Sequence, residues 1–214
     1  MIRILILLLV ALVMAPVHAQ VVPVSPVTNV NTGVNYASIT EAIEAASAGD
    51  VLQLLPVRFT EHVDIDLPLT LKGDPSGLTI IDVSQEIGWG ITLSSDQITL
   101  EDFSVIGGDV NTEYAVHSEP GITGLTIQNV GVLASQRSCI DLNGLTGPDF
   151  SLLENITVSG SSIGFGLALS ACSNVTINNV NGSGNGFGDI AIMASNYYDQ
   201  EFQNITFLGE LDLD

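Results

Sequence analysis

The sequence predicts an all-β fold: a right-handed parallel β-helix, a solenoid of about six coils, with a short N-terminal capping helix. A short apolar unit centred on Ile91 recurs at Ala115, Ile140, Leu167 and Ile190, so the repeat is near 24 residues long. Within each unit apolar and polar residues alternate, which is typical of strands. Similar strands at a fixed period favour a solenoid over a sandwich, because a coil that adds one turn per repeat stacks like residues on like residues.

The chain divides into three expected segments. Residues 1–19 combine Arg3, an apolar run and the small-residue site that ends at Ala19, which is the pattern of a cleaved secretory signal peptide. Residues 20–33 are expected to be an N-terminal linker, and residues 34–214 the β-helix domain. The chain ends in an acidic stretch with no second cap, so the domain either tolerates a bare end or is C-terminally truncated.

A helical cap is expected at the start of the domain. Ser38 and Glu41 form a capping box, and Gly49 is a stop signal. One helical face between them is apolar, with Ile39, Ala42, Ile43 and Ala46. Laid across the first coil, this face would shield strand edges that otherwise invite aggregation.

Two inward columns and a set of left-handed turns follow from the repeat. The columns are Ile91, Ala115, Ile140, Leu167 and Ile190, and beside them Leu93, His117, Leu142, Leu169 and Ile192. Asn155, Asn174 and Asn204 each precede a strand unit, where a residue that tolerates a left-handed backbone suits a tight bend. His117 is accordingly expected to be a core histidine.

Charge and composition exclude several partners. The chain has 24 acids against four Lys and Arg, a net charge of −20, so nucleic acid and anionic membrane surfaces are disfavoured. No apolar run after the signal is long enough to span a membrane. The protein is therefore expected to be secreted, periplasmic or on the cell surface. Two cysteines do not make a disulfide framework, and we interpret them as packing residues.

Residues 34–82 carry a family resemblance. Tyr36 to Asp50, the strand-like run 51–56 and the Leu-Lys-Gly turn at 71–73 resemble the N-terminal cap and first coils of the pectin-lyase-like superfamily, with pectin methylesterases and NosD-like proteins most similar. The resemblance implies a right-handed β-helix and a polysaccharide substrate class. Those families usually read Pro-Gly-x-Tyr where this chain has Pro-Val-Arg-Phe at 56–59, and the methylesterase catalytic motif is only partly matched at 149–153. No catalytic residue is carried over.

Two functions from different classes remain open. The first is a non-catalytic secreted or surface module whose elongated acidic face binds a polysaccharide or cell-surface component. The Trp and Tyr rings within the repeats are Trp89, Tyr114, Tyr197 and Tyr198, and we expect Trp89 to stack on a glycan. The alternative is a polysaccharide-degrading enzyme, either a calcium-assisted lyase or an acid-pair hydrolase. Its expected centre is Arg137 with Asp141, and Asp189 beside a Gly-rich bend is the calcium candidate; no other cofactor is evident.

Overall fold

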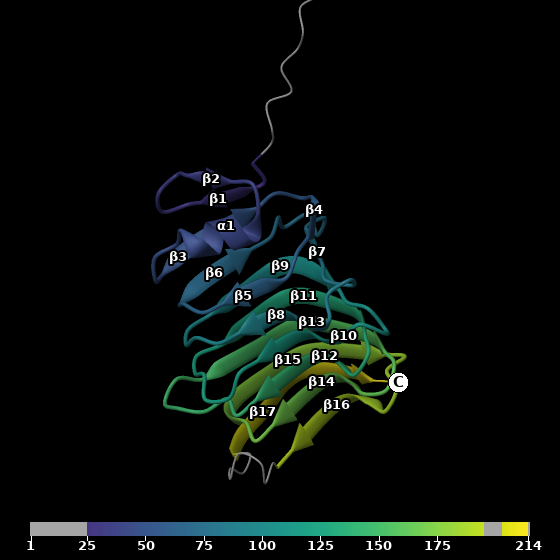
Figure 1. The fold of residues 1–214 in the computed structure, drawn as a ribbon. Coiled ribbons are helices and arrows are strands. Elements are labelled where there is room, and N and C mark those ends of the chain that lie inside the picture. The colour runs from purple at the N-terminus through teal and green to yellow at the C-terminus, as the bar shows by residue number, and fades with distance from the viewer. Residues whose placement is uncertain (1–24, 195–202, 214) are drawn as a thin grey trace, which may run out of the picture.

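The computed structural model describes residues 25–194 and 203–213, and it is a β-solenoid of about five turns (Figure 1). The all-β, parallel β-helix prediction is confirmed; the sequence repeat predicts about six coils, close to the number found. The expected signal peptide, Tyr197 and Tyr198 lie outside the described residues.

The N-terminal cap is built as the sequence predicts. Helix α1 (Ile39–Glu44) starts at Ser38, whose hydroxyl accepts from the Glu41 backbone N–H, and its Ile39, Ala42 and Ile43 side chains are buried. Glu61 accepts from the first backbone N–H groups of α1. The cap also contains β1 (Val27–Asn29) and β2 (Asn35–Tyr36), and β1 pairs antiparallel with β3 (Asp50–Leu54). The segment expected as a linker therefore supplies a strand.

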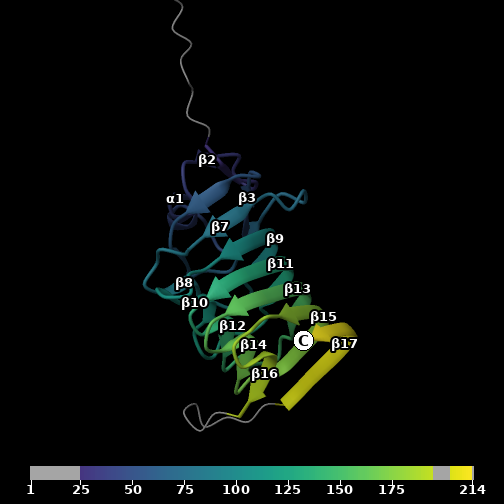
Figure 2. The same ribbon diagram turned by 90° about the vertical axis from the view of Figure 1, so that its right-hand side faces the viewer.

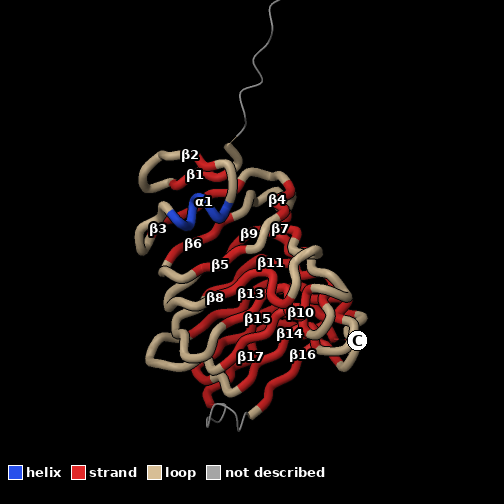
Figure 3. The backbone as a smooth tube through the Cα atoms, viewed as in Figure 1, coloured by secondary structure: helices blue, strands red, loops and turns tan. Residues whose placement is uncertain are grey.

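Two sheets run the length of the solenoid and face each other, as Figures 2 and 3 show. The longer sheet stacks β3, β6 (Leu69–Lys72), β9 (Thr99–Ile106), β11 (Thr126–Ser135), β13 (Ser151–Ser161), β15 (Ser173–Ser183) and β17 (Gln203–Leu213), with β4 (Arg58–Thr60) and β7 (Ile80–Asp82) beside them. The shorter sheet stacks β5 (Val63–Ile65), β8 (Gly88–Leu93), β10 (Thr112–Ser118), β12 (Ser138–Asn143), β14 (Phe165–Ser170) and β16 (Gly188–Met193). Pairing along each stack is parallel from β3 and β5 onward.

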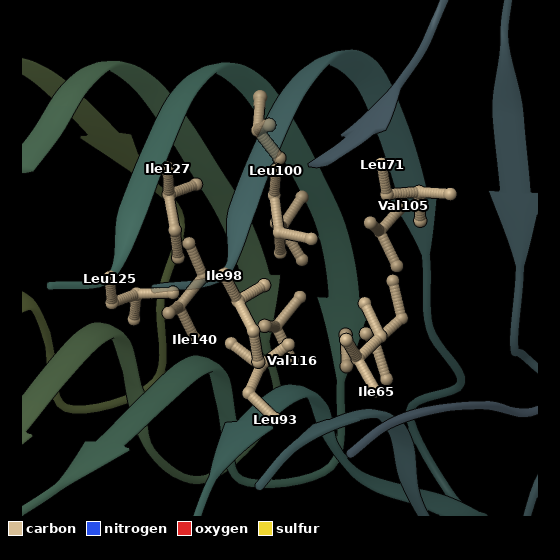
Figure 4. Close-up of a cluster of buried hydrophobic side chains, with 14 of the residues drawn as sticks. Ile65, Leu71, Leu93, Ile98, Leu100, Val105, Val116, Leu125, Ile127 and Ile140 are labelled. Carbon is tan, nitrogen blue, oxygen red and sulfur yellow. The ribbon is translucent and has the colours of Figure 1, made fainter. Parts of the chain in front are cut away.

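Aliphatic columns fill the space between the sheets (Figure 4). Leu71, Leu100, Ile127, Leu153 and Ile177 form one column on the longer sheet, and all are 0% exposed. Each such side chain contributes about 1.5–3 kcal/mol by leaving water. Burial of this kind, repeated on every coil, is the main stabilising term.

Strand β10 departs from the expected columns. Val116, rather than Ala115, pairs with Ile91 and Ile140 in the inward column. The register shifts between Thr112 and Tyr114, and a shift of one residue exchanges the two faces of a strand. His117 therefore lies in the outward column, and its expected place in the core is wrong.

Asparagines with a left-handed backbone occur at the predicted positions, but they lie within strands β13, β15 and β17 rather than in turns. Asn155, Asn174 and Asn204 have φ of 51°, 58° and 51°. Their amides bond along the solenoid axis in two separate ladders. Asn155 donates to Asn129 at 2.9 Å, whereas Asn204 donates to Asn174 at 2.9 Å.

Candidate functional site

A pocket of about 500 Å³ opens on the outer face of the shorter sheet. It spans β8 to β16, and its lining includes Trp89, Tyr114, His117, Arg137, Asp141 and Phe187. A volume of this size is usual for small-ligand sites. The sequence candidates Trp89, Arg137 and Asp141 thus meet in one place.

The outward column of the sheet explains why the surface is hollowed there. From β10 to β16 the column runs His117, Asp141, Ala168 and Ala191, so large side chains give way to methyl groups. Ala168 is 1% exposed although it points outward, because the side chains around the pocket cover it. Ala168 therefore forms part of the pocket floor.

Aromatic rings stand along one side of this column. Trp89 pairs with Tyr114 on the next coil. The His117 ring stacks on Trp89 with centroids 3.9 Å apart, and it lies 5.4 Å from the Tyr114 ring. Further along, Phe165 and Phe187 meet edge to face at 6.0 Å. Such rings offer flat apolar faces to a ligand.

His117, Asp141 and Asn143 form a hydrogen-bonded cluster beside the rings. His117 Nδ1 lies 3.0 Å from Asp141 Oδ2, and Asn143 Nδ2 donates to the same oxygen at 2.7 Å. Because an ionised carboxylate only accepts hydrogen bonds, the proton of the neutral His117 ring lies on Nδ1 and Nε2 carries the lone pair. Within the described residues, Nε2 has no hydrogen-bond partner and is not a buried unsatisfied atom.

Arg137 belongs to the same pocket but has another partner. Its Nη1 donates to Glu113 Oε1 at 2.7 Å, and the guanidinium lies 5.6 Å from the centre of the Tyr114 ring. The hydrogen bond to Glu113 raises the pKa of Arg137 above its usual value. The described residues show no ion pair between Arg137 and Asp141: Arg137 pairs with Glu113, and Asp141 with His117.

Asp189 lies apart from the pocket lining. It is 5% exposed at the start of β16, and Asn185 Nδ2 donates to its Oδ1 at 2.6 Å. In the part of the chain that the structure describes, no group of three or more His, Cys, Asp or Glu is placed to hold a metal ion. A calcium role for Asp189 stays a prediction.

Sequence reasoning missed His117, Phe165 and Phe187 as members of the site. His117 was hidden by the register shift in β10, since a constant repeat of 24 residues aligns it with Leu93, whereas in the structure it pairs with Thr92. Phe187 precedes β16 in a Gly-rich turn and gives no periodic signal. Tyr114, one of the rings that the sequence analysis names, lies in the pocket lining and occupies the coil position of Trp89 one repeat later.

Comparison with known proteins gives one informative match. A stretch of 105 residues, 48% of the chain, is 31% identical to a protein named "Cell surface glycoprotein" from Methanothermus fervidus, and it spans 16% of that protein. No protein-family profile matches the chain, and no solved structure matches it. None of the helices in the described residues is long and apolar enough to cross a membrane. The β-solenoid fold and the name of this relative are both consistent with a module at the cell surface.

Proposed function

We propose that the protein is a secreted or cell-surface β-solenoid module that binds a glycan in the pocket on its shorter sheet. One observation carries the proposal: the pocket sets aromatic rings on one side of a polar, small-residue floor. The name of the relative supports the location. The cap and parallel coils also support kinship with the pectin-lyase-like superfamily, which we include in the proposal.

The chemistry of the lining suits a sugar. Pyranose rings have apolar C–H faces that pack on Trp and Tyr, while their hydroxyls bond to fixed polar groups. Asp141 and Asn143 are such groups, and they come from a strand whose residues are all buried. Groups held on strands are more rigid than groups on loops, so less entropy is lost when a ligand binds.

A glycan array probed with residues 20–214 tests the proposal. Trp89→Ala should lose at least tenfold in affinity for any glycan that the wild type binds, because it removes the ring that packs on His117. Phe150→Ala is the matched control, since Phe150 is 64% exposed and does not line the pocket. Equal binding by Trp89→Ala and wild type, or no glycan bound at all, would overturn the proposal.

The His117–Asp141 pair favours a second candidate, the polysaccharide lyase or hydrolase. A histidine oriented by a carboxylate is a usual general base. Polygalacturonate, pectin and alginate, incubated with and without calcium, should then give unsaturated or new reducing ends. His117→Ala should abolish that signal, and full activity of Arg137→Ala would remove Arg137 from the mechanism. If no substrate reacts, the catalytic candidate fails.

A further inference from the structure

The cations of the described residues are all neutralised. Arg58 is paired with Asp82, Lys72 with Glu101, and Arg137 with Glu113. Arg137, the cation of the pocket, is 54% exposed at its side chain, yet Glu113 sits on its Nη1 at 2.7 Å. A ligand carboxylate on the same guanidinium would lie near the Glu113 carboxylate, and these like charges repel.

Two polar groups at the centre of the pocket, Asp141 and His117, present hydrogen-bond acceptors to a ligand. Both hydrogen bonds on Asp141 end on Oδ2, so Oδ1 is the oxygen left for a ligand. The Nδ1 proton of His117 is used on Asp141, so neutral His117 offers a lone pair at Nε2. Acceptors of this kind suit hydroxyl donors, and an ionised carboxylate or sulfate has no proton to give them.

The charge of the whole chain acts in the same direction. At −20, with each described cation paired to an acid, the protein repels anions at low ionic strength. Resting on the proposed glycan-binding function, we propose that the pocket selects neutral glycans and rejects uronic-acid and other anionic ones. Glu113 is the specificity-determining residue, because it cancels the charge of Arg137.

Paired ligands that differ only at C6 test this selectivity. Galactose oligomers carry a hydroxymethyl group where galacturonate oligomers of equal length and linkage carry a carboxylate. Calorimetric titration at low salt should give at least tenfold tighter binding of the neutral member. Higher salt should narrow the gap, because screening weakens the repulsion of the uronate.

Two variants identify the residue responsible. Glu113→Gln frees Arg137 and should raise the ratio of uronate to neutral affinity about tenfold. Glu119→Gln removes the same charge at the end of β10 without touching Arg137, and it should change that ratio far less. Their difference isolates the local pair from the overall charge.

The outcomes separate this inference from the function on which it rests. Uronate binding as tight as neutral binding in the wild type would overturn the selectivity while leaving glycan binding intact. An unchanged ratio in Glu113→Gln would remove Glu113 as its cause. If neither oligomer nor any other glycan binds, the proposed function itself fails.

Discussion

Two leucines near one strand differ only in the face they occupy. Leu125 precedes β11 and is 0% exposed in the cluster of Figure 4, whereas Leu133 on β11 is 52% exposed. Leu125→Ala should lower the free energy of unfolding by about 2–5 kcal/mol, since it removes buried methyl groups and leaves a cavity. Leu133→Ala should change it by about 0.5 kcal/mol at most. For a chain of this length the first loss corresponds to a fall in melting temperature of roughly 4–20 °C.

Urea unfolding followed by circular dichroism provides the measurement. The fluorescence of Trp89, the single tryptophan, gives a second probe in the coil before that of Leu125. Coincident transitions would justify a two-state free energy, which a repeat protein does not guarantee. Equal losses in the two variants, or a greater loss in Leu133→Ala, would refute the register of β11 and the solenoid core described above.

Three further predictions concern the reactivity of the buried thiols, the stability at low pH, and a glycine at a close contact between two coils. Burial raises the pKa of Cys139 and Cys172 to about 11, so at pH 8 about one thiol in a thousand is ionised. A thiol reagent should therefore label these cysteines only after denaturation. Rapid labelling of the native protein would contradict their burial. The hydrogen bond from the Ser47 backbone N–H, followed by that from the Asn29 side-chain amide, lowers the pKa of Asp50. The ionised Asp50 carboxylate therefore stabilises the fold above about pH 4, and this contribution is lost as the pH falls. Asp50→Asn should accordingly reduce the loss of folding stability on acidification. Gly73→Ala places a methyl group against the backbone carbonyl of the next coil and should cost about 1–3 kcal/mol; a variant as stable as wild type would show that the coils separate easily.

Local sequence determined the repeat, the cap and the left-handed bends. Apolar alternation sets a strand, a capping box sets a helix start, and an asparagine that tolerates positive φ sets a bend, each within a few residues. The sequence also brought Trp89, Arg137 and Asp141 forward as candidates, and one pocket contains all three. The chemistry of these three side chains identifies them as candidates even when their neighbours in space are not known.

Tertiary structure alone decided which faces and partners these residues use. The shift in β10 turned His117 outward, and alternation could not predict it because the irregularity shows only against the adjacent coils. Arg137 bonds to Glu113, 24 residues away in sequence, rather than to Asp141 four residues ahead. In a parallel coil, neighbours in space are one full turn apart along the chain, so the site was settled by the stacking of turns.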